Sequence, residues 1–149
     1  MTAGRRIAFD YGDVRIGVAI SDASGLLALP LEHIQNNSDS LFNECGALLA
    51  EHEPIYIAVG FPLHMSGKTS AKSSAVEEFC SKLSRIASAP IYLIDERMTT
   101  VSAGRLLKEA GLNSRQARTE IDSQAAVAIL DAALNQERIQ GQPIMKYAE

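Results

Sequence analysis

The first residues of the chain alternate between apolar and polar side chains with period two, which is the pattern of a half-buried β-strand. Over residues 5–12, Ile7 and Phe9 point to one face of this strand, and Ala8 and Asp10 point to the other. Aspartate is depleted in strands, and an unpaired buried carboxylate is costly. Asp10 is therefore a residue that the strand would not need for folding alone.

Two more strands are predicted from the turns that precede them. Gly12–Asp13 is a tight-turn signal, and the alternating stretch Ile16–Ile20 follows it, so the first two strands are expected to form an antiparallel hairpin. Ser24–Gly25 marks another turn before a third strand at about residues 27–34. The first part of the chain therefore predicts a three-stranded antiparallel meander.

From residue 38 onward, the hydrophobic period alternates between that of helices and that of buried strands. Two nearly continuous apolar runs, 55–59 and 90–95, are typical of parallel strands buried on both faces. The end of the chain, about 141–149, is expected to be a polar tail. Four helices are predicted: one that begins near Ser38 or Asp39, one with an apolar stripe from Val76 to Ala87, one from Thr99 or Thr100 to Gly111, and one at about 120–138.

This order of elements predicts a single domain, residues 1–149, of the α/β class. Its five-stranded mixed sheet would have three antiparallel strands followed by two parallel ones, with helices on both faces. In such sheets, sites form beyond the carboxyl ends of the strands, where the strand order reverses. Asp10 and Glu96 both come late in their strands, so we expect them to meet there.

A third acidic residue, Asp122, is placed by the periodicity of the last predicted helix. Ala126, Ile129 and Ala133 share one face of this helix, and Asp122 lies at the start of that apolar stripe. Asp131 lies about 180° around the helix from Asp122 and is expected in solvent. Small alanines in the stripe would let the helix approach the sheet closely, so that Asp122 could reach the edge where the other two acids lie.

Three carboxylates at one edge of a sheet predict a divalent cation. Asp10, Glu96 and Asp122 would repel one another, and Mg²⁺ or Mn²⁺, which prefer oxygen ligands, would relieve that repulsion. Such a site suits phosphodiester hydrolysis, in which two ions about 4 Å apart activate a water and stabilise the leaving oxygen. Asp95 remains an alternative to Glu96, because alternation does not decide which of these neighbours points at the site.

Each of the three acids also has a simpler structural explanation. Asp10 could accept hydrogen bonds from turn amides at the end of its strand. Glu96 could pair with Arg97 or Arg15, and Asp122 could favour the positive end of a helix dipole. Their joint occurrence is what favours a shared site.

Composition narrows the class of protein. The apolar content of 46% and the charged content of 21% are ordinary for a globular chain, and no run of about 18 apolar residues predicts a membrane span. Residues 1–6 lack the apolar core of a signal peptide. Cys45 and Cys80 fall on apolar stripes without metal-ligand spacing, so both are expected as reduced core residues of a cytoplasmic protein.

Charge gives a weaker indication of partners. The net charge of −4 argues against nucleic-acid binding by bulk attraction, but it leaves room for a local basic groove. Lysine and arginine beside an acidic site can hold phosphates, which position a nucleic acid without reading its bases. The basic residues that flank the acidic positions are Arg15, Lys68, Lys72, Arg97, Arg115 and Arg118.

From this set we select Arg15, Lys68 and Arg97 as candidate substrate-binding residues. Arg97 is the strongest of the three, because it directly follows Glu96 in the sequence. The alternative for each is ordinary solvated charge.

Four motifs of the chain resemble those of the YqgF (RuvX-like) family. They occur in the order of that family and span nearly the whole chain, whereas Phe61 and His64 depart from its usual pattern in a single loop. The motifs are Asp10–Gly12 with Arg15–Ala19 and Ser21–Asp22, Val59–Leu63 with Gly67, Asp95–Thr100, and Ile121–Ala126.

This resemblance implies a ribonuclease H-like fold of the branch related to Holliday junction resolvases. It also implies a nuclease that trims the 5′ end of precursor 16S ribosomal RNA, a step of ribosome biogenesis. By motif position, Asp10, Glu96 and Asp122 would be the catalytic and metal-binding acids. The resolvase branch often carries a fourth acid one turn later, where this chain has Ala125 and Ala126. That departure weighs against efficient junction resolution more than against simple hydrolysis.

The sequence and the resemblance together predict a hydrolase, a metal-dependent endonuclease that acts on precursor ribosomal RNA with Mg²⁺ or Mn²⁺. Ribosomal assembly intermediates are the expected partners, and no membrane is involved. The alternatives are a Holliday junction resolvase and a non-catalytic RNA-binding factor of ribosome assembly or transcription. A further alternative is an ATP-dependent phosphotransferase, because such enzymes also begin with an Asp-x-Gly motif. They need two domains of this kind around the nucleotide, whereas this sequence supplies one. RNA versus DNA preference, the number of metal ions and the oligomeric state do not follow from the sequence.

Overall fold

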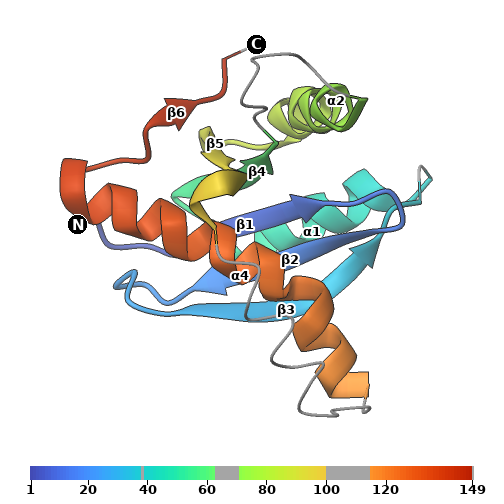
Figure 1. Cartoon of the computed structure of the whole chain (residues 1–149), viewed down its shortest axis with the longest axis horizontal. Helices are drawn as coiled ribbons and strands as arrows, with labels where there is room; N and C mark the ends of the chain where they lie inside the picture. The colour runs from blue at the N-terminus through green and yellow to red at the C-terminus, as the bar shows by residue number, and fades with distance from the viewer. Residues whose placement is uncertain (38, 63–70, 100–114, 149) are drawn as a thin grey trace.

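The structure is a computed structural model in which residues 1–37, 39–62, 71–99 and 115–148 are described (Figure 1). The side chains of Met98 and of residues 115–122 lie outside this description. Among the described helices, none is long and apolar enough to cross a membrane.

The strands form one mixed sheet in the order β3-β2-β1-β4-β5-β6. The first three strands pair antiparallel, and β4 and β5 run parallel to β1, as the sequence predicted. The sheet therefore confirms the expected mixed topology. The bounds of the strands are Arg6–Tyr11 for β1, Arg15–Ser21 for β2, Ala28–Gln35 for β3, Tyr56–Phe61 for β4, Ile91–Asp95 for β5 and Met145–Lys146 for β6.

The sheet has six strands and not the predicted five. The sixth, β6, lies within the segment that was expected to be a polar tail, and it pairs antiparallel with β5 through Tyr92–Lys146 and Leu93–Met145. Two residues are too few to show an alternating pattern, so the periodicity of the sequence could not reveal this strand. Its effect is to cover the outer edge of β5, which would otherwise expose unpaired backbone groups.

Two of the helix predictions are corrected in their bounds. Helix α1 begins after Ser40, one or two residues later than the predicted caps, because the Asn37 carbonyl accepts from the amides of Ser40 and Leu41 and forms a turn first. Helix α4 begins at Arg115 and not near residue 120, since good helix formers precede the apolar stripe. The bounds are Leu41–His52 for α1, Ala71–Ile86 for α2 and Arg115–Gln140 for α4.

Of the other two helix predictions, the one with the apolar stripe from Val76 is observed as α2, and the other lies mostly outside the described residues. A helix was expected from Thr99 or Thr100 to Gly111, and residues 100–114 are not described. Before them, Glu96–Met98 form a 3-10 turn, η1, that directly continues β5. Helix α4 ends at Gln140, and the next residue, Gly141, has a φ of 93°, in the left-handed region that favours glycine.

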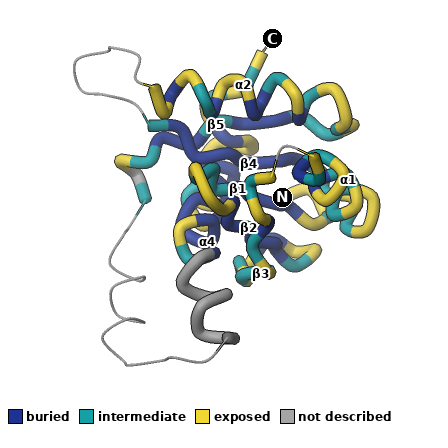
Figure 2. Tube along the Cα trace, turned by 90° about the vertical axis from the view of Figure 1, so that its right-hand side faces the viewer, coloured by how far each residue is buried: buried dark blue, intermediate teal, exposed yellow. Residues whose placement is uncertain are grey.

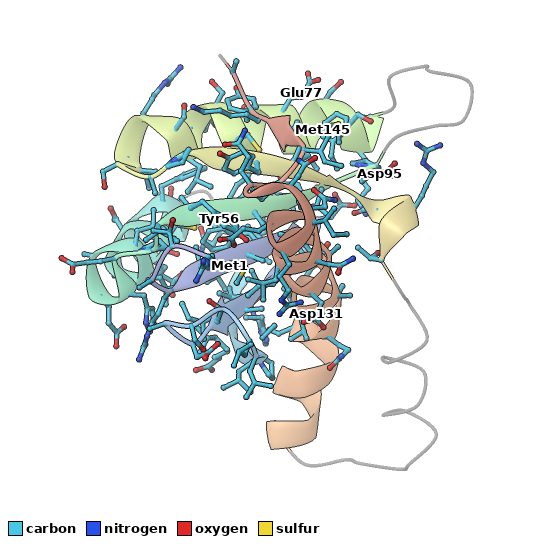
Figure 3. The ribbon with its side chains drawn as sticks, turned by 90° about the vertical axis from the view of Figure 1, so that its left-hand side faces the viewer. Met1, Tyr56, Glu77, Asp95, Asp131 and Met145 are labelled. Atoms are coloured by element: carbon cyan, nitrogen blue, oxygen red, sulfur yellow. The ribbon has the colours of Figure 1, made fainter. Side chains whose placement is uncertain are left out.

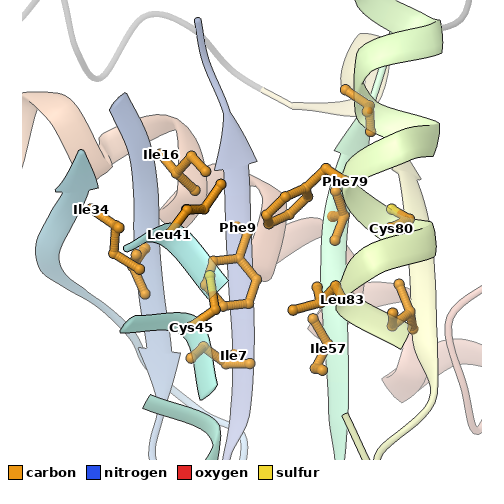
Figure 4. Close-up of a cluster of buried hydrophobic side chains, with 14 of the residues drawn as sticks. Ile7, Phe9, Ile16, Ile34, Leu41, Cys45, Ile57, Phe79, Cys80 and Leu83 are labelled. Atoms are coloured by element: carbon orange, nitrogen blue, oxygen red, sulfur yellow. The ribbon is translucent and has the colours of Figure 1, made fainter. Parts of the chain in front are cut away.

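Helices cover both faces of the sheet, so that the strands are buried between two apolar layers (Figures 1 and 2). On one face, α1 and α2 pack on β1 and β4 around Phe9, Ile57, Phe79 and Leu83 (Figure 4). The free and buried Cys45 and Cys80 belong to this layer, as their positions on apolar stripes predicted. The core of the second face is built from different residues.

On the opposite face, α4 is the helix of the described residues that packs across the sheet. Small alanines from both sides make this layer thin: Ala8, Ala19 and Ala58 of the strands face Ala126 and Ala133 of the helix. All five are completely buried. The helix backbone therefore lies close to the sheet, which determines how near its residues come to the strand ends.

A buried ion pair joins the C-terminal half of α4 to the start of β1. Nε of Arg6 lies 3.0 Å from Oε1 of Glu137, and Nη2 of Arg6 lies 2.6 Å from Oε2, so the guanidinium contacts both carboxylate oxygens. Arg6 is 0% exposed and Glu137 is 4% exposed. The carbonyls of Thr2, Gly4 and Ala23 accept the remaining guanidinium donors. A buried pair that is satisfied in this way is stable only as a complete unit.

Candidate active site

Asp10 lies near the end of β1 on the face that α4 covers. Ala8 points into the layer beneath α4, so alternation directs Asp10, two residues later, to the same side. Its antiparallel partner on β2 is Gly17, which has no side chain to fill the adjacent space. Asp10 is half-buried. The strand thus presents a carboxylate at the rim of the sheet, as the sequence predicted.

Glu96 comes from the neighbouring part of the sheet and leans toward Asp10. It is the first residue of η1, directly after β5. Oε1 of Glu96 lies 3.5 Å from the point where a Cβ on Gly60 would be. Gly60 belongs to β4, the strand between β5 and β1, and it is the next residue after the Phe9–Val59 pair in the parallel register. The Glu96 carboxylate therefore extends over the middle strand toward the end of β1.

The electrostatic coupling of the two acids agrees with this geometry. The pKa of Asp10 is raised from its ordinary value of 3.8 to about 6, first because burial removes the carboxylate from water and second because the negative charge of Glu96 is near. The positive charge of Lys72 opposes this rise. Two carboxylates are thus held together at a cost, which is the electrostatic situation that a cation would relieve.

Asp95, the alternative to Glu96, has a different role. Ile91 and Leu93 pack into the layer of α1 and α2, so alternation places Asp95 on that face, away from Asp10. Its carboxylate accepts from the backbone amide of Arg97 at 2.9 Å and from Nη2 of Arg97 at 2.7 Å. This contact caps η1, and Asp95 is labelled at its base in Figure 3. The positions of the two side chains favour Glu96 over Asp95 as the partner of Asp10.

Lys72 is a charged neighbour of Asp10 and Glu96. The sequence indicated this lysine only as one of six basic residues that flank the acidic positions. It lies in the first turn of α2, and its Nζ is 3.6 Å from Oε1 of Glu96. The following residue, Ser73, is buried, and its Oγ donates to the carbonyl of Pro62 at 3.0 Å. That hydrogen bond attaches the start of α2 to the chain that leaves β4. Only the fold reveals this role of Lys72, because no spacing in the sequence relates it to Glu96.

The backbone of Asp122 is brought to the same region by its neighbour Ser123. The Ser123 hydroxyl accepts from the amide of Val18 at 3.2 Å and donates to the carbonyl of Leu31 at 2.6 Å. It therefore bridges β2 and β3 next to the register shift between Ile16 and Val18. Val18 follows Gly17, the residue opposite Asp10. This chain of contacts places the main chain of residue 122 beside the strand pair that carries Asp10.

The other predicted site residues differ in how far the structure describes them. Arg97 is 52% exposed and held by Asp95, and Arg15 is exposed at the start of β2. Lys68 lies outside the described residues. Asp131 is exposed, as its position on the helix predicted. The described acids that come together are Asp10 and Glu96, and within the described side chains no group of three potential metal ligands occurs.

The residues at this edge fit a divalent cation. The carboxylates of Asp10 and Glu96 lie close together, and carboxylate oxygens are the ligands that Mg²⁺ and Mn²⁺ prefer. Asp10 has its charged form disfavoured by burial, and a bound cation would restore it. The chemistry of the donor set, rather than any single distance, is what supports the fit.

Comparison with solved structures defines the fold first. A Thermus thermophilus RuvC in complex with a Holliday junction substrate aligns with a TM-score of 0.62 and 14% sequence identity, over 97% of this chain and 99% of that chain. A second Thermus thermophilus RuvC structure gives a TM-score of 0.61 and 13% identity, over 96% and 99% of the two chains. At these identities the likeness shows the fold alone. The chain has the ribonuclease H-like fold of RuvC, which confirms the predicted fold class.

Sequence comparison then gives the family. A family model described as "RuvX: Holliday junction resolvase" matches residues 4–136. A "Putative pre-16S rRNA nuclease" of Streptomyces coelicolor is 42% identical over 145 residues, covering 96% of this chain and 87% of the relative. A protein of the same name from Nocardioides sp. is 42% identical over 146 residues, covering 95% and 94%. The chain belongs to the RuvX family, as its motifs indicated, and is an enzyme of the nuclease class.

Proposed function

We propose that this nuclease is a metal-dependent endonuclease that hydrolyses phosphodiester bonds in the 5′-end processing of precursor 16S ribosomal RNA. Two of its relatives are named for pre-16S rRNA, which supports the substrate. An RNA precursor as substrate would place the reaction in the cytoplasm and among ribosomal assembly intermediates. The observation that carries the proposal is the Asp10–Glu96 pair, which the fold holds together at one sheet edge despite mutual repulsion.

Asp10, Glu96 and Asp122 are the proposed ligands of Mg²⁺ or Mn²⁺ and the catalytic acids. When bound, the metal supplies Lewis-acid activation of a water and stabilisation of the leaving oxygen. Asp10 contributes a carboxylate from a rigid central strand, and Glu96 contributes one from the turn that ends β5. Asp122 would join them from α4, whose main chain is attached one residue later through Ser123. Ligands on three separate elements give a site that requires the complete fold.

Arg15, Lys68 and Arg97 are the proposed contacts to phosphates of the nucleic acid. Arg97 has its guanidinium oriented by Asp95 next to η1, with 52% of the side chain exposed. An oriented and exposed guanidinium suits a phosphate, because its planar donors match two oxygens at once. Such contacts fix the position of the strand without reading its sequence. Specificity for one precursor would then come from the shape of the RNA.

Holliday junction resolution is the second candidate function. It is favoured by the description of the family model and by the RuvC fold. Against it stands the pair Ala125 and Ala126, where a fourth acid would be expected in the resolvase branch. The third candidate is an RNA-binding factor without catalysis. It predicts RNA binding that survives removal of all three acids.

The test compares two substrates with one protein preparation. The purified chain is incubated with a precursor 16S leader RNA and, separately, with a DNA four-way junction, each with Mn²⁺ or Mg²⁺. The control is the triple variant Asp10→Asn, Glu96→Gln, Asp122→Asn. Cleavage of the RNA by the wild type and not by the triple variant supports the proposal. Preferential cleavage of the junction supports the resolvase, and RNA binding without cleavage by either protein supports the non-catalytic factor.

A further inference from the structure

Lys72 forms an ion pair with Glu96, one of the two acids at the candidate site. Its Nζ lies 3.6 Å from Oε1 of Glu96, and its positive charge also acts on Asp10. The lysine side chain is 53% exposed and that of Glu96 is 30% exposed. One ammonium group therefore partly neutralises two carboxylates from the solvent side.

The position of Lys72 follows from the fold rather than from the length of its side chain. The neighbouring Ser73 is 2% exposed and donates to the carbonyl of Pro62, so the first turn of α2 is fixed at the end of β4. Gly60, on the same strand, lies beneath the Glu96 carboxylate. The Lys72 ammonium group therefore lies near β4, the strand between Asp10 and Glu96.

We propose that Lys72 is a positioning residue that serves as a built-in monovalent counter-ion for Asp10 and Glu96, and that it thereby lowers the affinity of this site for divalent cations. This inference rests on the proposed function, since it concerns the same site. The ammonium holds Glu96 in place over Gly60 in the metal-free protein. It is exposed enough to pair with a phosphate of the nucleic acid when Glu96 has another partner, because lysine is a flexible point charge.

A second lysine on the same helix provides a matched control. Lys82 is 50% exposed and its Nζ lies 3.1 Å from Oε1 of Glu78, one helical turn away. This pair has the same chemistry as Lys72 and Glu96 but lies away from Asp10. Exposed ion pairs of this kind have little effect on stability. Any effect of Lys72 on metal binding that Lys82 does not share is therefore due to its place beside the acidic pair.

The experiment measures Mn²⁺ binding to the full chain by titration calorimetry at low salt, without nucleic acid. The proteins are the wild type and the variants Lys72→Met, Lys72→Arg and Lys82→Met, with circular dichroism and thermal melting as checks of folding. Lys72→Met should bind Mn²⁺ about 3- to 10-fold more tightly, because one repelling charge is removed from the site. Lys82→Met and Lys72→Arg should bind like the wild type. The gain should shrink at high ionic strength, since the lysine is half-exposed.

Whether Lys72→Met raises or lowers the affinity for Mn²⁺ distinguishes the proposed role of Lys72 from a merely structural one. If Lys72 only supported the fold, its loss would loosen Glu96 and weaken Mn²⁺ binding. Unchanged or weaker binding by folded Lys72→Met, with a wild type that binds Mn²⁺ and cleaves RNA, overturns the inference and leaves the proposed function standing. A wild type that binds no Mn²⁺ overturns both.

Discussion

The carboxylate of Asp95 holds Arg97 through the backbone amide, Nε and Nη2 of that residue. The pKa of Asp95 is lowered, first by the hydrogen bond from the Arg97 side chain, so the carboxylate remains charged. Asp95 thus orients an arginine beside the site, whereas its neighbour Glu96 faces the site itself. Two adjacent acids of one motif thus have different partners, and we expect them to have separate tasks.

We expect Asp95→Asn to weaken nucleic-acid binding while leaving metal affinity nearly unchanged. The amide removes the charge that fixes the Arg97 guanidinium, so one phosphate contact is lost and affinity should fall by roughly 3- to 10-fold. Glu96→Gln should do the reverse and reduce Mn²⁺ affinity most. Fluorescence anisotropy with labelled RNA and calorimetry with Mn²⁺ measure the two properties. A loss of Mn²⁺ binding in Asp95→Asn that equals the loss in Glu96→Gln would contradict this division.

Asp10→Asn should stabilise the metal-free protein at neutral and alkaline pH. The folded state raises the pKa of Asp10 from 3.8 to about 6, so the native state binds a proton more strongly than the unfolded state does. The native state is therefore destabilised as pH rises from about 4 to about 6, and the full cost remains above that range. Asparagine carries no such cost, and the gain should be about 1–3 kcal/mol at pH 8.

The measurement is chemical denaturation of both proteins at pH 8 and pH 4. The difference in the free energy of unfolding should largely disappear at pH 4, because Asp10 is then protonated in the native state. Millimolar Mg²⁺ at pH 8 should stabilise the wild type and not the variant. Equal stabilities of the two proteins at pH 8 without metal would show that burial and Glu96 do not disfavour the charged Asp10.

Gly60→Ala should destabilise the protein and disturb the acidic pair together. A Cβ at this position would lie 2.6 Å from Cδ1 of Ile129 on α4 and 3.5 Å from Oε1 of Glu96. The first contact forces the helix or the isoleucine to move, at a cost of about 1–3 kcal/mol. Gly46→Ala is the matched control, since its Cβ would meet only Cδ1 of Ile86, at 3.9 Å. Thermal melting and Mn²⁺ calorimetry test both effects.

The double variant Gly60→Ala, Ile129→Val tests the cause of that destabilisation. Removing the Cδ1 atom of Ile129 gives the new methyl group room, so part of the lost stability should return. Destabilisation that remains unchanged would indicate that the backbone at Gly60, and not the helix contact, is responsible.

Ser123→Ala should remove the bridge between β2 and β3 and lower stability by about 1–3 kcal/mol, because the amide of Val18 and the carbonyl of Leu31 lose a buried partner. Ser84→Ala is the control, since the Ser84 hydroxyl donates to the carbonyl of Ser81 within its own helix. Amide hydrogen exchange gives the sharper readout: the Val18 amide should exchange faster in Ser123→Ala. An unchanged rate at that amide would refute the bridge.

Glu137→Ala should be the most destabilising single change of this set, at about 3–5 kcal/mol, because it leaves the fully buried Arg6 guanidinium without its partner. Glu78→Ala, which breaks an exposed pair with Lys82, should change stability by less than about 1 kcal/mol. Denaturation midpoints compare the two. A similar loss of stability in both variants would mean that the buried Arg6–Glu137 pair stabilises the fold no more than the exposed pair does.

Much of the sheet could be predicted because its strands follow simple periods. Alternation in β1 placed Asp10 on the correct face, and continuous apolar runs identified the parallel strands. The same alternation, applied to β5, also distinguishes Asp95 from Glu96 once the faces are assigned from the packing of Ile91 and Leu93. Alternation alone could not decide between Asp95 and Glu96, because the sequence does not show which face of the sheet α4 covers.

Other features had no local signal in the sequence. Arg6 is buried because Glu137, 131 positions away, neutralises it, and neither residue differs in pattern from a solvated charge. The contact of Lys72 with Glu96 depends on where α2 begins relative to β4. Long-range pairs of this kind are specified by the assembled fold, so periodicity and turn chemistry cannot reveal them.

Within the described part of α4, polar side chains attach the helix to strands at Ser123, near the acidic edge, and at Glu137, near the opposite end. The two attachments are separated by about 21 Å along the helix axis, at 1.5 Å per residue. Since a helix moves as a rigid rod over this length, loosening the distant attachment would tilt the helix and alter its spacing from the ends of the strands at the acidic edge. For the proposed nuclease, substitutions at Arg6 or Glu137 are therefore expected to change the separation of α4 from the strand ends that carry Asp10 and Glu96.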